Sequence, residues 1–189
     1  YTGEVGYELY VPSHKAVACW EGLMKAGEKA GIKACGLGSR DLLRLEVGYL
    51  LYGNDMDEQT TPLEAGAAYA EQIAATLGRA GAAFAVDFTK GEFIGSQVLI
   101  EQKEKGATRR LVAFELLQKG VPRHEMKILA DGQEIGVVTS GNLSPRLQKG
   151  IGLGYVPMKF SAPGTKFQID IRGRMHQAVV VTLPFYKRK

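Results

Sequence analysis

The sequence predicts an α+β fold, with helices in the first part of the chain and short β-strands in the second. Segments before Gly106 place apolar residues at helical spacing between capping residues and glycines. After Gly106, six short β-type runs follow without an intervening helix, and turn signals such as Asp131-Gly132 separate them. We therefore expect an α+β part over residues 1–106 and a small antiparallel barrel or sandwich over residues 107–189.

Composition limits the class of protein. The 189 residues are 45% hydrophobic and 23% charged, which is typical of a globular protein, and no apolar run approaches the roughly 18 residues of a spanning helix. The two cysteines lack a C-x-x-C spacing and the three histidines are scattered, so we expect free thiols and no metal site. A net charge of +4 suits an anionic small ligand or an acidic partner. The basic-aromatic pattern of a nucleic-acid binder is missing.

The opening stretch, YTGEVGYELYVP, reads as a strand over residues 3–11 or the end of a hairpin. In such a strand Glu8 shares a face with Gly6 and Tyr10. A half-buried carboxylate is costly unless hydrogen-bond donors meet it. Either an arginine supplies them, or a ligand does. A planar ring with an amino group beside a ring N–H would satisfy both carboxylate oxygens.

Two helices are expected next. The first has Ser13 as its cap, an apolar face that includes Val17 and Trp20, and Gly31 as its stop. The second is a short buried helix with Ser39 as a cap candidate. It carries Arg40 and Arg44 four residues apart, on one helical face. Arginines in such a position usually pair with a carboxylate, and an anion-binding site is the alternative.

Five further segments carry a local signal, four in the first part of the chain and one in the β-rich part. Thr61-Pro62 predicts a helix start, with an alanine-rich helix running to about Leu77. FAVDF predicts a strand, and a further helix is expected over Ser96–Lys105. NDMDE, at 54–58, is interpreted as a solvated turn because calcium-loop spacing is missing. TSGNLSPRLQKG is interpreted as a long hairpin loop, since it lacks the order of a phosphate loop.

Several long motifs occur in a fixed order: YTGEVGYELYVP, GLGSRDLLRLEVGYLLYGNDMDEQTTPLEAG, KGEFIG and TSGNLSPRLQKGIGLGYVP. In this order the chain resembles the glycine cleavage system T-protein family, the aminomethyltransferases. The resemblance implies an enzyme that binds tetrahydrofolate as a substrate. Such an enzyme takes an aminomethyl group from the lipoyl arm of H-protein, releases ammonia and forms 5,10-methylenetetrahydrofolate. The first part of the chain would then belong to a folate-binding domain.

The resemblance also assigns roles to residues. Glu8 matches the glutamate that hydrogen-bonds the pterin, and Arg40 matches the arginine that reaches the glutamyl end of the folate. Tyr186 is the candidate for a tyrosine that assists at the glutamyl end, although its spacing after LPF departs from the family pattern. No residue of this chain matches the family's catalytic aspartate, so no catalytic residue is assigned.

The chain departs from the family in length. Family members are about twice as long, and YTGE falls near their midpoint, so the chain is expected to be the C-terminal half of a longer protein. We therefore expect the isolated chain to be inactive and to self-associate through surface that its other half would cover. A second departure is an insertion near residues 66–82, where AGAA occurs twice. It is expected to extend a peripheral helix whose deletion leaves the fold intact.

Other functions are also compatible with the sequence. Folate-dependent demethylases and the folate-binding halves of sarcosine and dimethylglycine dehydrogenases would keep a glutamate like Glu8, and a non-catalytic folate-binding domain is a further alternative. Folate-binding proteins of iron–sulfur assembly carry a cysteine where this chain has Glu92 or Phe93, which argues against them. By analogy, the location is the cytoplasm, or the mitochondrial matrix in a eukaryote, with no membrane or nucleic-acid partner.

Overall fold

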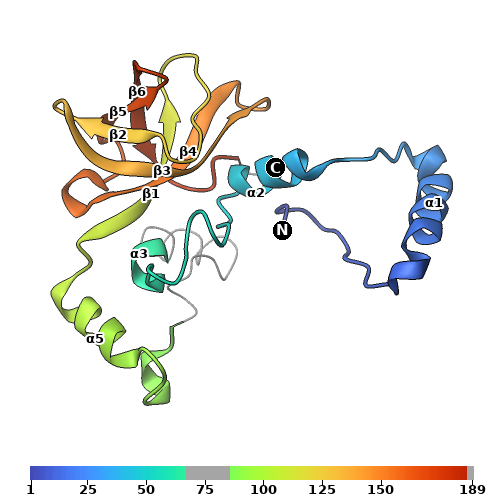
Figure 1. The fold of residues 1–189 in the computed structure, drawn as a ribbon, viewed down its shortest axis with the longest axis horizontal. Coiled ribbons are helices and arrows are strands. Elements are labelled where there is room, and N and C mark those ends of the chain that lie inside the picture. Colours follow the sequence, from blue (N-terminus) through green and yellow to red (C-terminus); the bar gives the residue numbers. More distant parts are fainter. Residues whose placement is uncertain (67–85, 187–189) are drawn as a thin grey trace.

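The computed structural model describes residues 1–66 and 86–186. Helices come first in the chain and a barrel of strands follows (Figure 1). The helices are α1 (Ala16–Gly27), α2 (Leu37–Glu46), α3 (Pro62–Gly66) and α5 (Ser96–Lys105), with 3₁₀ turns η1 (Ser13–Lys15), η2 (Glu28–Ala30), η4 (Phe88–Lys90) and η5 (Met158–Phe160). The segment that carries α1 projects away from the rest of the molecule.

Six antiparallel strands close into a barrel, and this closure decides between the two expected β architectures. The strands are β1 (Arg109–Leu116), β2 (Lys127–Ala130), β3 (Gln133–Ser144), β4 (Lys149–Pro157), β5 (Lys166–Ile171) and β6 (Arg174–Val181). They follow the order β1-β4-β3-β2-β5-β6, and β1 pairs with β6 to complete the ring. The α+β fold with a small antiparallel barrel is confirmed. The division of domains at residues 106 and 107 stays a prediction.

Strand β1 is buried on both faces, which explains its nearly continuous apolar run. Val112 and Phe114 point into the barrel core, where Ile128 and Ile169 pack against them. Leu111 and Ala113 alternate with them and belong to a second cluster outside the barrel. The barrel therefore has a filled interior and one apolar outer face.

The last turn of helix α2 packs against that outer face. Leu45 is fully buried and belongs to the same apolar cluster as Leu111, Ile151 and Leu183. Burial of a leucine of this kind contributes about 1.5–3 kcal/mol. This packing fixes α2 on the barrel, and with it the position of Arg40 in the first turn of the helix.

The expected strand at the N-terminus is wrong. Residues 3–11 form no strand, and both faces of the expected alternation are exposed, with Tyr7 and Tyr10 about equally open to solvent. Period-2 spacing produces a strand only where a neighbouring strand pairs with it. In the described part of the chain, residues 3–11 have no such neighbour.

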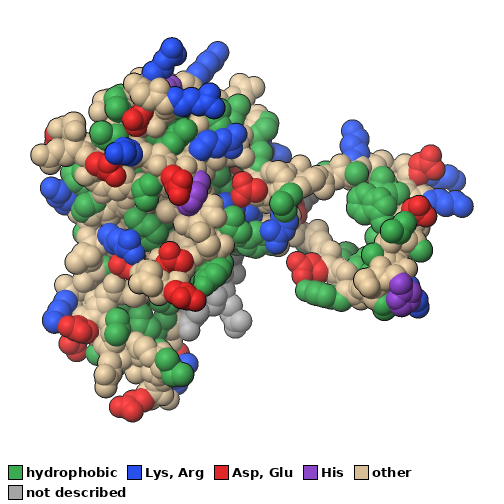
Figure 2. All heavy atoms as spheres, viewed as in Figure 1, with side chains coloured by type: hydrophobic (Ala, Val, Ile, Leu, Met, Phe, Trp, Pro, Cys, Tyr) green, Lys and Arg blue, Asp and Glu red, His purple; other side chains and the backbone are tan. Residues whose placement is uncertain are grey.

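The expected helix α1 is present, and its stop is confirmed. Gly31 has a φ of 74° and closes η2, which follows the helix directly. The expected cap is wrong, because Ser13 lies in η1 and makes no side-chain cap. Figure 2 shows hydrophobic side chains on the surface of this projecting segment. In α1, the side chains of Val17, Trp20 and Leu23 are exposed.

The cap predicted for α2 is also wrong, because Ser39 lies inside the helix and Gly36 precedes it. The helix is less buried than expected. Only Arg44, Leu45 and Glu46 are buried in it, and Leu43 is exposed. The helix therefore uses its last turn, rather than its whole length, to pack on the barrel.

The start of α3 is confirmed. The Thr61 amide donates to Glu64, and the Glu64 amide donates to the Thr61 hydroxyl at 3.2 Å, which forms a capping box before Pro62. The helix expected to continue to Leu77, and the insertion at 66–82, fall almost wholly outside the described residues. α5 spans Ser96–Lys105 as predicted, and Gly106 follows it.

Two other sequence interpretations need correction. The end of FAVDF lies in η4 rather than in a strand, because Asp87 accepts from the Thr89 amide and turns the backbone there. The segment at 139–150 is mostly strand, because β3 continues to Ser144 and pairs with Lys149. The loop is therefore a short turn at the tip of the β3–β4 hairpin.

Candidate functional site

A pocket of about 350 Å³ lies between the opening segment and the first turn of α2. Glu8 and Arg40, the two residues singled out in the sequence, both line it although 32 positions separate them. The complete lining is Tyr1, Thr2, Glu4, Gly6, Tyr7, Glu8 and Arg40. A carboxylate and a guanidinium thus face one concavity, beside aromatic rings.

Glu8 is exposed rather than half-buried, which corrects the sequence interpretation. Its Oε2 accepts a hydrogen bond of 2.9 Å from the hydroxyl of Tyr10, so the two side chains are in contact although no strand forms here. This hydrogen bond is the main cause that raises the pKa of Tyr10. None of the ion pairs among the described residues involves Glu8. Its second oxygen can therefore meet donors of a ligand.

Tyr1 holds Arg40 at the edge of the pocket. The guanidinium carbon of Arg40 lies 4.5 Å from the centre of the Tyr1 ring, which is cation–π geometry. The Tyr1 hydroxyl donates to the carbonyl of Leu50 at 2.5 Å, and its ring stacks on Tyr49 at 6.0 Å. Burial raises the pKa of Tyr1, which favours the protonated hydroxyl that makes this bond. Tyr1 was not predicted from the sequence. The available signal was its place in YTGEVGYELYVP, the same motif that contains Glu8.

Tyr186 lies outside the pocket that Glu8 and Arg40 line. The guanidinium of Arg146 stacks on its ring at 3.8 Å, and its amide donates to the carbonyl of Glu46 at 3.0 Å. Tyr186 does not line the pocket that holds Glu8 and Arg40. A role for it at the glutamyl end of a ligand stays a prediction.

Arg44, one turn after Arg40, has the structural role that was expected as the default. Its Nη1 donates to Asp55 at 2.6 Å, and its Nε and Nη2 both donate to Asp41. Asp55 is fully buried, so the interpretation of NDMDE as a solvated turn is wrong at this position. The reason is long-range, because strand β3 provides two hydroxyl donors to Asp55, from Thr139 and Ser140.

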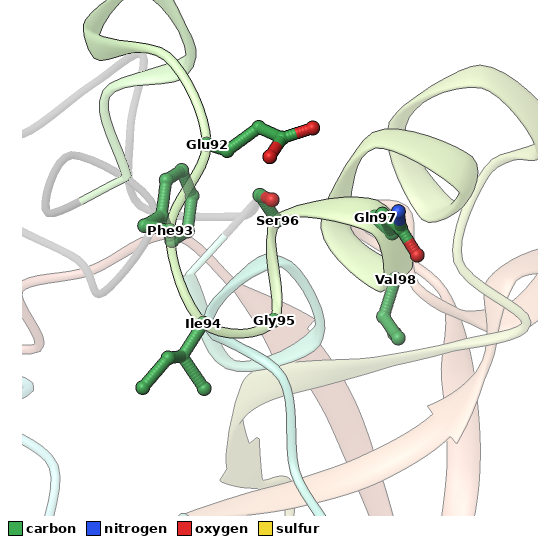
Figure 3. Close-up of a pocket in the computed structure, with 7 residues that line it drawn as sticks. All are labelled: Glu92, Phe93, Ile94, Gly95, Ser96, Gln97 and Val98. Atoms are coloured by element: carbon green, nitrogen blue, oxygen red, sulfur yellow. The ribbon is translucent and has the colours of Figure 1, made fainter.

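The KGEFIG motif forms a separate pocket of about 490 Å³, lined by residues 92–98 at the start of α5 (Figure 3). Ile94 points away from Glu92 and Ser96 and is fully exposed. Gly95 turns the chain with a φ of 85°, which favours glycine. Over residues 1–66 and 86–186, no group of three His, Cys, Asp or Glu side chains is placed to hold a metal ion. No helix in these same ranges is long and apolar enough to cross a membrane.

Together, these observations describe an α+β protein with a small antiparallel barrel and a candidate pocket that one anionic and one cationic side chain line. Comparison with known proteins matches both parts of the chain to one family. The family model described as the GCVT N-terminal domain matches residues 1–74, and the glycine cleavage T-protein C-terminal barrel domain matches residues 109–187. The chain belongs to the glycine cleavage T-protein family.

Individual aminomethyltransferases are similar to the chain over nearly its whole length. The chain is 49% identical to the aminomethyltransferase of Halothermothrix orenii over 98% of its own length and 48% of the relative's. It is 45% identical to that of Caldanaerobacter subterraneus, over 100% and 46% of the two lengths. The crystal structure of glycine cleavage system aminomethyltransferase T from Bartonella henselae matches with a TM-score of 0.83 at 32% identity, over 98% of this chain and 48% of that one. The chain thus spans about half the length of these relatives.

Proposed function

We propose that this chain provides the folate-binding part of a tetrahydrofolate-dependent aminomethyltransferase of the glycine cleavage system. The enzyme moves the aminomethyl carbon from the lipoyl arm of H-protein to tetrahydrofolate and releases ammonia. The observation that carries the proposal is the pocket that holds Glu8 and Arg40 together. The names of the relatives, aminomethyltransferases in each case, support it.

Glu8 is suited to the pterin end of the ligand. The pterin presents an amino group beside a ring N–H, and a carboxylate accepts from both through charge-assisted hydrogen bonds. Because Glu8 is exposed in the pocket, a ligand can reach its carboxylate. The hydroxyl of Tyr10 donates to one of its oxygens and orients the carboxylate.

Arg40 is suited to the glutamyl end. A guanidinium binds a carboxylate with two parallel hydrogen bonds, and its planar fork makes this geometry specific. The Tyr1 ring supports the guanidinium from one side at 4.5 Å. The N–H groups of Arg40 lie in the plane of its guanidinium. A carboxylate can therefore approach them from the edge while the Tyr1 ring stays on the face.

These residues bind and orient the folate, and we assign no proton transfer to them. In the proposed reaction, N5 and N10 of tetrahydrofolate take the methylene carbon, the amine leaves as ammonia, and the lipoyl sulfur is released as a thiol. The resemblance places the carboxylate that serves this chemistry in the other half of family members.

The barrel has the charge to receive an acidic partner surface. Residues 107–189 carry 14 of the 24 lysines and arginines but only 5 of the 20 acidic residues. Such a field steers an oppositely charged partner and weakens as salt rises. Lipoylated H-protein is the partner that the proposed reaction requires. Since the relatives are bacterial, we propose a cytoplasmic location.

A turnover assay tests this proposal. The protein at its natural length is mixed with aminomethylated H-protein and tetrahydrofolate, and methylenetetrahydrofolate and ammonia are measured together. The proposal predicts that both appear in equal amounts. Parallel reactions contain sarcosine or dimethylglycine in place of H-protein, and there 5-methyltetrahydrofolate is measured, because transfer of the intact methyl group to N5 in exchange for its proton needs no oxidant. Turnover of these methylated amines, with none from H-protein, would assign the chain to a demethylase instead.

A further inference from the structure

We propose that Asp55, with Thr139 and Ser140 of the barrel, positions Arg40 for its ligand. The structure joins the barrel to the pocket through a continuous series of hydrogen bonds and ring contacts. Asp55 and its barrel partners are positioning residues, because they act on the pocket through Tyr1 and do not line it. This inference rests on the proposed function for the identity of the ligand.

The first link joins the barrel to Asp55. The hydroxyl of Thr139 donates to Oδ1 of Asp55 at 2.5 Å, and the hydroxyl of Ser140 donates to Oδ2 at 2.9 Å. All three side chains are buried, at 5%, 3% and 0% exposure for Thr139, Ser140 and Asp55. A buried carboxylate without donors is costly, so these hydroxyls hold Asp55 in one position.

The second link joins Asp55 to the backbone of residues 49–51. Oδ2 of Asp55 accepts from the Leu51 amide at 2.9 Å and from Nη1 of Arg44 at 2.6 Å. The same Nη1 donates to the carbonyl of Tyr49 at 3.1 Å. The carboxylate and the guanidinium therefore fix this backbone on both sides of Leu50.

The third link joins that backbone to the pocket. The carbonyl of Leu50 accepts from the Tyr1 hydroxyl, and the Tyr49 ring stacks on the Tyr1 ring. The Tyr1 ring also contacts Arg40, whose guanidinium lies over it at 4.5 Å. A shift of Leu50 therefore moves Tyr1, and with it the group that receives the ligand's carboxylate.

The energetic coupling between the barrel hydroxyls and ligand binding at Arg40 is expected to be moderate, because each substitution removes only one of several contacts that hold Asp55. Energetic coupling between separated sites in proteins typically changes affinity by about 5- to 150-fold. We expect the lower part of this range for loss of the Thr139 hydroxyl, because Ser140 and Arg44 still hold Asp55.

The test compares two substitutions at one position in the protein at its natural length. Thr139→Val keeps the shape of the side chain and removes the hydroxyl, whereas Thr139→Ser keeps the hydroxyl. Calorimetric titration with tetrahydrofolate should show about five- to twentyfold weaker binding for Thr139→Val and nearly native binding for Thr139→Ser. Ser144→Ala is the matched control, because this buried serine also joins the barrel to α2 but does so through Glu46. Its affinity should stay near the native value.

A double-mutant cycle separates positioning from a general loss of stability. In an Arg40→Ala background the Thr139→Val substitution should have little further effect on affinity, because the residue it positions is gone. An equal loss in both backgrounds, or native affinity of a folded Thr139→Val protein, would overturn the inference.

Hydrogen exchange tests the same chain of contacts without a folate. Thr139→Val should speed exchange of the Leu51 amide, while Thr139→Ser should not. If the native protein does not bind tetrahydrofolate, the proposed function fails and this measurement still decides the inference. Unchanged exchange at Leu51 in Thr139→Val would then overturn it.

Discussion

Arg44 and Asp55 form a buried ion pair with 2.6 Å between Nη1 and Oδ2, at 2% and 0% side-chain exposure. The pair joins α2 to the turn that follows it, and the hydroxyls of β3 join both to the barrel. The helix that carries Arg40 is therefore fixed by a polar cluster as well as by the burial of Leu45.

Removal of one partner of this pair is expected to destabilise the protein strongly. Asp55→Ala leaves the Arg44 guanidinium buried with one of its two carboxylates missing, and such a loss typically costs about 3–5 kcal/mol. Urea denaturation followed by circular dichroism measures this change in the free energy of unfolding. Glu134→Ala is the control, because it breaks the exposed pair with Lys127 and should cost less than about 1 kcal/mol. Equal small losses in the two variants would show that the Arg44–Asp55 pair adds no net stability.

Stability is expected to fall at alkaline pH because of Tyr155. Burial raises the pKa of its hydroxyl, which donates to the carbonyl of Asp55. The folded protein thus keeps this proton at a pH where the unfolded chain, with a pKa of about 10, has lost it. The contribution of Tyr155 is complete below about pH 10 and is lost as pH rises above it.

Tyr155→Phe tests this dependence. The variant lacks the titrating group, so its free energy of unfolding should fall less than that of the native protein between about pH 9 and 11. Tyr10→Phe is the comparison, because Tyr10 is exposed and its pKa is raised mainly by the bond to Glu8. Parallel alkaline losses in the native and Tyr155→Phe proteins would contradict the expected role of Tyr155.

The 189-residue chain is expected to self-associate when isolated. The projecting segment exposes Val17, Trp20 and Leu23 on α1, and neighbouring apolar groups of this kind associate in water. Sedimentation velocity should show oligomers that become fewer in Trp20→Glu. Val98→Glu makes a similar change at an exposed position on α5 and should leave the distribution unchanged. A native chain that stays monomeric at high concentration would rule out this role for α1.

Features set by neighbouring residues were predictable from the sequence. α5 begins at Ser96 and ends before Gly106 as predicted, and Thr61 and Glu64 form the capping box in front of α3. The six strands of the barrel were also recognisable, because each lies between turn signals. In these elements the local pattern and the final structure agree.

Features set by distant residues were not predictable. Asp55 looked like part of a solvated turn, because its donors Thr139 and Ser140 follow 84 and 85 positions later. The alternation in residues 3–11 looked like a strand, although the described residues offer no strand to pair with it. Glu8 and Arg40 were candidates from their sequence context, and motif resemblance gave them specific roles, but only the structure shows them in one pocket with Tyr1.

The division of labour between Glu8 and Arg40 is the central claim, and one titration series tests it most directly. The protein at its natural length is titrated with tetrahydrofolate and with tetrahydropterin, which lacks the glutamyl end. Glu8→Ala should weaken binding of both ligands by about 1.5–3 kcal/mol, with a smaller loss for Glu8→Gln. Arg40→Ala should weaken binding of tetrahydrofolate alone, by an amount that shrinks as salt rises, and Arg40→Lys should recover part of the loss. Native affinity of Glu8→Ala for both ligands, in a folded protein, would contradict the account.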